Sequence, residues 1–133
     1  KDMTADELAY CQDAVANWKR LQPAIMDGDQ YRLVSPYETN HMAVNYVSKD
    51  QKKAVLFAYD VYPRFQEKLI NVKLQGLDPN KTYKVEEINL MPGVDSALKS
   101  NGQTYTGDYL MKVGIEVFGF AATQSHVLEL TAM

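Results

Sequence analysis

The chain has 133 residues, of which 46% are hydrophobic and 23% are charged, and these are ordinary proportions for a globular protein with one core. The 14 basic and 17 acidic residues leave a net charge of -3, so composition gives no electrostatic reason to expect nucleic acid as a partner. No apolar run approaches the roughly 20 residues that span a bilayer, so we expect no membrane segment.

The N-terminal segment has the pattern of an amphipathic helix. Thr4 and Glu7 form a capping box, and apolar residues follow at spacings of three and four: Leu8, Cys11, Val15, Trp18 and Leu21. We expect the helix to end near Gln22, because Pro23 disfavours helical geometry in the residue before it, and a short turn to follow through Met26. Cys11 is the single cysteine, and its apolar neighbours predict a small buried side chain rather than a nucleophile or ligand.

From Tyr31 onward, the pattern changes to short runs of β-branched and aromatic residues that are bounded by Gly, Pro, Asn and Asp. The runs predict strands at 31–34, 42–48, 54–59, 69–74, 83–89, 114–118 and 126–130, and no second helix is expected. Polar or turn-forming residues connect them, as at 48–52, 78–81 and 101–102. The expected fold is therefore mainly β: an antiparallel Greek-key β-sandwich of about seven to eight strands with an N-terminal α-helix.

The sequence contains no convincing catalytic or metal-binding motif. Glu86 and Glu87 are adjacent on a predicted strand, so their side chains should point to opposite faces and cannot converge on one sugar. His41 and His126 are far apart, and each is interpreted as a surface or strand-end histidine. The aspartates of predicted turns, Asp60 among them, have local hydrogen-bonding explanations. The glycines form no nucleotide-binding motif, and we predict no cofactor.

An aromatic group gives the sequence its most plausible ligand-contacting residues. Tyr59, Tyr62 and Phe65 lie close together, and Tyr105 and Tyr109 follow farther on. Aromatic faces stack on sugars, so the first three residues are candidates for sugar contact. The competing interpretation is that these rings pack in the core or against neighbouring strands.

Four segments in order along the chain carry a resemblance to a known family. They are Gly28-Asp29-Gln30-Tyr31-Arg32-Leu33, the run from Gly76 to Val85, Leu90-Met91-Pro92-Gly93, and the run from Asn101 to Ile115. Together they resemble the C-terminal part of α-galactosidases of glycoside hydrolase family 36. The sequence also starts at Lys1 without a signal-peptide pattern, which fits an excised piece. No compartment is predicted from it.

The resemblance implies a fragment of two parts. Residues 1–28 resemble the last helix of a catalytic (β/α)8 barrel, and 29–133 resemble the β-sandwich that follows it. The helix would then pack on the barrel, because a sandwich already closes its own core. The family's nucleophile is expected at the end of a strand in a Lys-Trp-Asp-like motif, but Trp18 is the only tryptophan and lies on the helix. No catalytic role can be carried over to this chain.

The first functional hypothesis is a non-catalytic domain that stabilises the barrel of an α-galactosidase, whose parent hydrolyses terminal α-D-galactosides with retention. In this hypothesis Asp29, Tyr31 and Arg32 lie at the junction of barrel and sandwich, and the parent is a candidate homo-oligomer. The second hypothesis is an independent carbohydrate-binding module that uses Tyr59, Tyr62 and Phe65. An immunoglobulin-like adhesion domain is a distant third, since the paired cysteines are absent.

Overall fold

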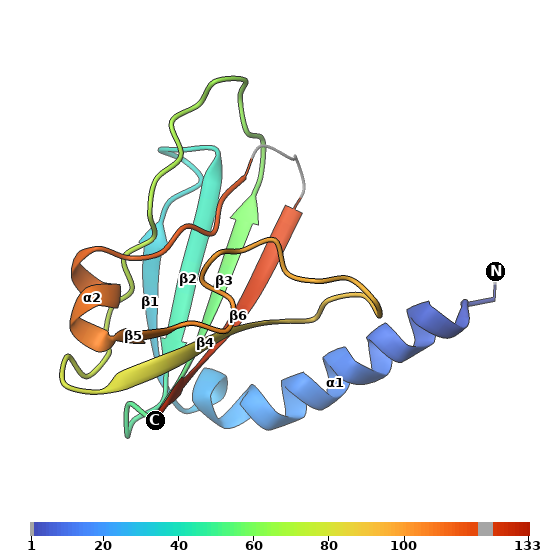
Figure 1. Cartoon of the computed structure of the whole chain (residues 1–133), viewed down its shortest axis with the longest axis horizontal. Coiled ribbons are helices and arrows are strands. Elements are labelled where there is room, and N and C mark those ends of the chain that lie inside the picture. The colour runs from blue at the N-terminus through green and yellow to red at the C-terminus, as the bar shows by residue number, and fades with distance from the viewer. Residues whose placement is uncertain (1, 120–123) are drawn as a thin grey trace.

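The computed structural model describes residues 2–119 and 124–133, which form one antiparallel sheet, two helices and long connecting segments (Figure 1). The elements are α1 (Ala5–Met26), β1 (Asp29–Val34), β2 (His41–Val47), β3 (Lys53–Asp60), β4 (Thr82–Ile88), β5 (Thr104–Thr106), α2 (Gly107–Lys112) and β6 (Gln124–Ala132). The strand order is β1-β2-β3-β6-β4-β5. The mainly β, antiparallel fold with an N-terminal helix is thus confirmed.

The sheet grows from a tight hairpin that the sequence encodes locally. The polar turn 48–52 joins β2 to β3, whose register runs from Val47 opposite Ala54 to His41 opposite Asp60. β6 then pairs with β3 on one side and with β4 on the other. The last strand in the chain, β6, is therefore a central strand of the sheet. Within the described residues, strands β4 and β5 are joined to the other strands only through β6.

A second layer covers the inner face of the sheet, but it is less regular than the sequence predicted. The segments expected to be strands at 69–74 and 114–118 meet only in one isolated bridge, between Val72 and Ile115. The core lies between this layer and the sheet, and its fully buried members include Leu56, Val72, Leu74, Tyr83, Val85, Leu110, Val117, Leu128 and Leu130. The described residues hold six named strands rather than seven or eight, because the second layer packs by side chains instead of by a hydrogen-bonded ladder.

The short helix α2 was not predicted. Its N-cap is Thr106, whose hydroxyl accepts a hydrogen bond from the backbone N–H of Tyr109, and Leu110 is buried in the core. A six-residue helix is too short to show a helical period in the sequence. Its formation therefore depends on the cap and on tertiary packing.

Helix α1 begins as predicted, with the capping box of Thr4 and Glu7 formed, but it does not end at Gln22. It continues through Pro23 to Met26, with Asp27 as its C-cap. Leu21 and Ala24 are both buried against the sheet. Packing on both sides of Pro23 therefore offsets the hydrogen bond that the proline ring removes.

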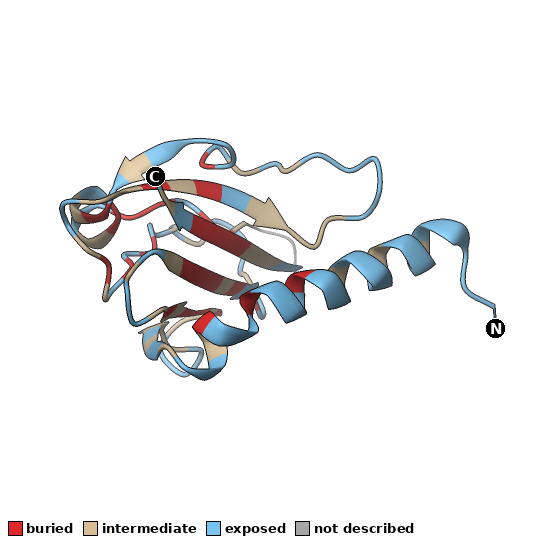
Figure 2. Cartoon of the chain, turned by 90° about the horizontal axis from the view of Figure 1, so that it is seen from below, coloured by how far each residue is buried: buried red, intermediate tan, exposed pale blue. Residues whose placement is uncertain are grey.

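Among the described residues, only the C-terminal turns of α1 contact the rest of the chain, and the N-terminal half of the helix extends beyond the sheet (Figures 1 and 2). The apolar stripe of α1 lies outside the core and is exposed: Leu8, Val15 and Trp18 are 49%, 52% and 46% exposed. Cys11 is exposed as well, so the prediction of a buried cysteine is wrong for this chain. The stripe is turned about 140° away from Leu21 and Ala24 around the helix axis, so one helix presents two different faces.

Gly28 joins α1 to β1 at a point where no other residue fits. A Cβ atom there would lie 2.1 Å from the carbonyl oxygen of Ala24 and 2.3 Å from that of Val47. Both obstacles are backbone atoms, so a side chain could be accommodated only by moving the helix away from the sheet. The glycine therefore sets the angle at which α1 leaves the domain.

Candidate functional site

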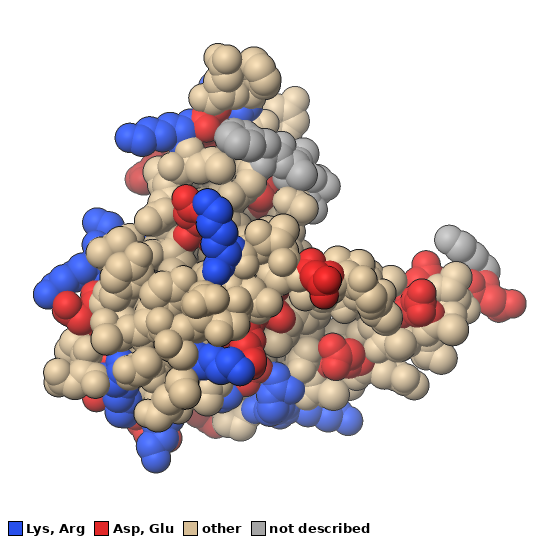
Figure 3. Space-filling view, viewed as in Figure 1, with Lys and Arg blue, Asp and Glu red and all other residues tan. Residues whose placement is uncertain are grey.

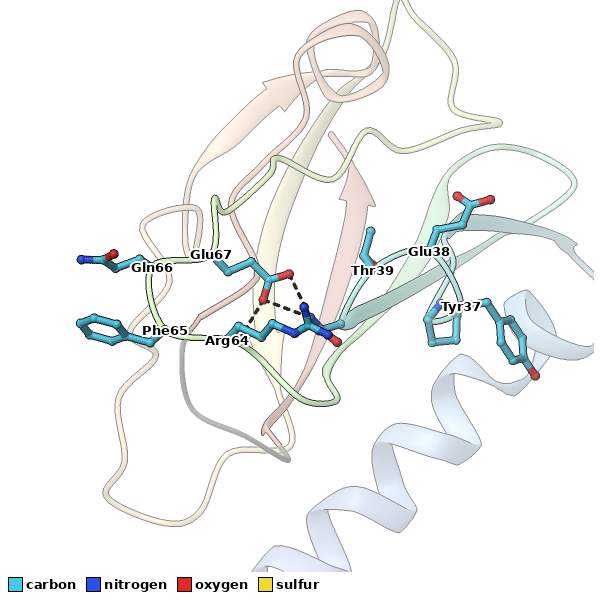
Figure 4. A pocket seen from close by; sticks show the side chains of 9 residues that line it. Tyr37, Glu38, Thr39, Arg64, Phe65, Gln66 and Glu67 are labelled. Atoms are coloured by element: carbon cyan, nitrogen blue, oxygen red, sulfur yellow. Dashed lines mark hydrogen bonds between the residues drawn. The ribbon is translucent and has the colours of Figure 1, made fainter.

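Two loops at one end of the sheet bound an open hollow of about 520 Å³. One loop follows β1 and the other follows β3, and the lining residues are Pro36, Tyr37, Glu38, Thr39, Asn40, Arg64, Phe65, Gln66 and Glu67. Figure 4 shows Arg64 and Glu67 on one side of the hollow and Tyr37, Glu38 and Thr39 on the other. Polar groups dominate this set, and the hollow is therefore the candidate site.

Glu67 is hydrogen-bonded to both loops that bound this hollow. Its carboxylate accepts hydrogen bonds from the backbone N–H of Arg64 at 2.9 Å and from the side-chain amide of Asn40 at 3.3 Å. The hydrogen bond from the Arg64 backbone lowers the pKa of Glu67 below its ordinary value, and the Asn40 amide adds to that effect. A carboxylate held ionised in this way can accept hydrogen bonds, but it is a poor general acid.

Behind the hollow lies a buried histidine–aspartate pair. Nδ1 of His41 is 2.8 Å from Oδ1 of Asp60, and both side chains are almost fully buried. The ring of Phe118 stacks on His41 at 4.4 Å between centroids, and the backbone N–H of Gly119 donates to Asp60. Nε2 of His41 has no hydrogen-bond partner within the described part of the chain and lies 3.7 Å from Glu67. The pair links the ends of β2 and β3, and it faces the loop that carries Glu67.

The sequence interpretation of these residues was partly wrong. His41 is at a strand end, as one of the two predicted alternatives had it, but it is buried rather than on the surface. Asp60 is the buried last residue of β3 rather than a turn residue. The hairpin register could have revealed them, because residues that pair across the 48–52 turn have numbers that sum to a constant. His126 also has a side-chain partner, because its Nδ1 lies 2.6 Å from Oε1 of Glu87.

The three aromatic residues predicted to contact sugar do not form one surface. Tyr59 is on β3 and is 37% exposed, whereas Tyr62 and Phe65 are in the following loop and are 72% and 93% exposed. Only Phe65 lines the hollow, and its ring projects away from it (Figure 4). The stacked tyrosine pair in the described residues is a different one, Tyr105 with Tyr109.

The residues proposed for the junction lie on β1, next to the end of α1. Asp29 accepts a hydrogen bond from Lys49 at 2.7 Å, which raises the pKa of Lys49. Tyr31 packs against the hydrophobic core, with its ring against Gly76. Arg32 is exposed on the same strand and lines a second hollow beside β2.

A network of polar groups holds the end of α1 on the outer face of the sheet. Glu129 of β6 is paired with Arg20 of α1 and, at 2.5 Å, with Lys53 of β3. Asn17 donates to Asn89 at 2.8 Å and accepts from Arg20. Burial raises the pKa of Glu129, but the hydrogen bonds from Arg20 and Lys53 outweigh burial, so its pKa lies below the ordinary value.

The described residues contain no group of three or more His, Cys, Asp or Glu side chains that could hold a metal ion. Glu86 and Glu87 do point apart as predicted: Glu86 is exposed and pairs with Lys84, whereas the Glu87 side chain is buried beside His126. Within the same part of the chain, no helix has the length and apolar character needed to cross a membrane.

Comparison with known proteins gives consistent matches. Residues 41–130 match the family described as Glycosyl hydrolase family 36 C-terminal domain. The probable alpha-galactosidase G of Aspergillus terreus is 30% identical over 114 residues, which are 86% of this chain and 14% of that protein. The crystal structure of the family 36 alpha-galactosidase AgaB from Geobacillus stearothermophilus superposes with a TM-score of 0.80 at 28% identity, covering 99% of this chain and 16% of that one. AgaA of the same organism, in complex with raffinose, gives a TM-score of 0.79 at 26% identity and covers 99% and 17%. The chain thus spans about one seventh of these relatives.

Proposed function

The chain belongs to the glycosyl hydrolase family 36 C-terminal domain family, and from this membership we propose that it is the accessory domain of an α-galactosidase. In this proposal the parent enzyme releases terminal α-linked galactose, and the domain braces the catalytic barrel without taking part in the chemistry. Residues 1–28 are the last helix of the barrel, and 29–133 form the accessory domain.

The observation that carries the proposal is the exposed apolar stripe of α1. Leu8, Val15 and Trp18 lie on a helix whose N-terminal half has no neighbour among the described residues (Figure 2). Exposed apolar side chains that continue along one helix face are characteristic of a surface that another domain covers. Burying such a face against the barrel would stabilise both parts at roughly 25 cal/mol per Å² of apolar area.

The carboxylates of the domain also suit a structural role. Retaining glycosidases need two carboxylates about 5 to 5.5 Å apart across an accessible sugar site. Here Asp60, Glu87 and Glu129 are buried and each is already paired with a histidine or a basic side chain. These carboxylates bind neighbouring elements of the fold, and none is free to attack a sugar.

The first test is hydrolysis of a chromogenic α-galactoside by the 133-residue chain. We expect no turnover above that of a heat-unfolded sample, and measurable turnover would overturn the non-catalytic assignment. A second test uses a full-length chain that carries this domain. Trp18→Ala should lower its melting temperature, whereas Tyr37→Ala, at a side chain that is 98% exposed outside α1, should not. Equal effects of the two variants would contradict the bracing role.

A carbohydrate-binding module is the second candidate, and the exposure of Tyr62 and Phe65 favours it. Fully exposed rings at a loop tip are available for stacking on a sugar. Calorimetric titration with galactose and raffinose tests this candidate. Binding that is lost in Phe65→Ala would support it, and binding that is unchanged in that variant would remove it.

A further inference from the structure

A second aromatic site lies between α2, β5 and the segment that carries Ser100. Tyr105 and Tyr109 stack with centroids 5.2 Å apart and ring planes only 12° from parallel, and Tyr109 is 42% exposed. The two rings border a hollow of about 240 Å³. This volume is below the range of about 300 to 1,000 Å³ that is typical of sites for drug-sized ligands, so the hollow suits one small ring.

The hollow also contains a buried hydroxyl with no partner. Ser100 is 3% exposed, and its Oγ forms no hydrogen bond within the described residues. An unsatisfied buried hydroxyl costs about 1 to 3 kcal/mol of stability, so a hydrogen-bond partner for it would be favourable. Asn71 and the ion pair of Lys99 with Glu116, at 3.6 Å, stand at the rim. Neutral and charged hydrogen-bonding groups therefore lie around the two stacked tyrosine rings.

Backbone contacts hold the frame of the hollow in place. Val72 and Ile115 exchange two backbone hydrogen bonds of 2.9 and 3.0 Å beneath it. Gly114, which also lines the hollow, has a φ of +79°, and a Cβ there would lie 2.2 Å from the carbonyl oxygen of Val72. Thr106 caps the helix that presents Tyr109. A preorganised site loses little entropy when a ligand binds.

We propose that this hollow is a binding site for one neutral pyranose ring, such as the terminal residue of an oligosaccharide. The exposed Tyr109 face would stack on the apolar C–H face of the sugar, and the rim groups would hydrogen-bond its hydroxyls. Because the hollow is small and its contacts are few, the expected affinity is in the millimolar range.

The site is independent of the bracing role. In Figure 1, α2 and β5 lie at the side of the molecule opposite the free end of α1, so a domain that covers the helix would leave Tyr109 accessible. It is also distinct from the loop that carries Phe65, since the two hollows share no lining residue. A sugar held here would attach the domain to substrate chains without being cleaved.

The test is a titration of the ¹⁵N-labelled chain with methyl α-D-galactopyranoside and with raffinose, followed by amide chemical shifts. We expect shifts centred on Asn71, Ser100 and Tyr109 that saturate. Tyr109→Ala should weaken binding about tenfold, Ser100→Ala should weaken it less, and Tyr109→Phe, which keeps the ring, should retain most of it. Tyr10→Ala is the matched control, because it removes a partly exposed tyrosine ring from α1, outside this hollow, and it should change nothing.

Three outcomes would overturn the proposal: no saturable shifts with either sugar, shifts centred on Phe65, or equal binding by Tyr109→Ala and the unaltered chain. Far-UV circular dichroism and the thermal midpoint of each variant separate lost binding from lost folding. The result does not depend on hydrolysis. Absent binding would leave the accessory role standing, and turnover of the chromogenic substrate would refute that role without affecting this site.

Discussion

At the residue scale, the ionisable groups of this domain serve its architecture. Three buried carboxylates each meet a partner from a distant part of the chain: Asp60 meets His41, Glu87 meets His126, and Glu129 meets Arg20 and Lys53. Burying a charge costs several kcal/mol unless it is paired and hydrogen-bonded. These pairs therefore favour one arrangement of the strands and disfavour registers that would separate the partners.

Removing one partner of the buried His41–Asp60 pair should lower the stability of the fold. Among the described residues, His41→Ala leaves the buried Asp60 carboxylate with only the Gly119 N–H to compensate it, so we expect a loss of about 3 to 5 kcal/mol in the free energy of unfolding. Urea denaturation measures it. Lys49→Ala is the control, because its pair with Asp29 is exposed and should contribute little to the free energy of unfolding. Similar losses in the two variants would show that burial of the pair is unimportant.

At the element scale, α1 is attached to the sheet mainly by its C-terminal turns. Leu21 and Ala24 supply apolar contact, and the network around Glu129 supplies the polar one. Arg20 and Lys53 approach the carboxylate from two different elements. The helix position consequently depends on the ionisation of one glutamate.

The pH dependence of stability follows from that glutamate. Because the folded pKa of Glu129 lies below its ordinary value of 4.5, ionised Glu129 stabilises the fold above pH 4.5, and this stabilisation is lost as the pH falls through the depressed pKa. Glu129→Gln should therefore be less stable at neutral pH, and its stability should fall less steeply on acidification. Urea unfolding across the acid range measures both slopes. Parallel slopes would mean that Glu129 is not the group responsible.

Acidic side chains gather toward the free end of α1 at the scale of the whole molecule, while Lys and Arg lie nearer the sheet (Figure 3). Asp2, Asp6, Glu7 and Asp13 precede Lys19 and Arg20 along the helix. The apolar stripe runs along the same free half. The exposed helix thus combines an apolar contact surface with a negative end, which favours a partner surface that is apolar and carries basic groups.

Without that partner, the stripe should cause self-association. We expect the chain to sediment increasingly as dimers or larger species with rising concentration, because exposed apolar stripes pair with each other. Changing Leu8, Val15 and Trp18 together to Ser should restore a monomer. Sedimentation velocity distinguishes the two, and circular dichroism should show that the sheet is retained. A monomeric unaltered chain at all concentrations would contradict the expectation.

Much of this protein was determined by local sequence. The capping box, the polar 48–52 turn and the alternation in β2 and β3 were sufficient to predict α1 and the central hairpin, because each depends on residues close together in the chain. The ordered family segments predicted the domain and its relatives. Local patterns also placed Glu86 and Glu87 on opposite faces of a strand.

Tertiary structure decided the rest, because those features depend on contacts between distant residues. No local sequence pattern reveals the pairing of Glu129 with Arg20 or the burial of Ser100. The same is true of α2, which is too short to show one, and of the irregular second layer, which packs without a ladder. Helix α1 passes Pro23 for the same reason: the burial of Leu21 and Ala24 outweighs a local preference of the backbone.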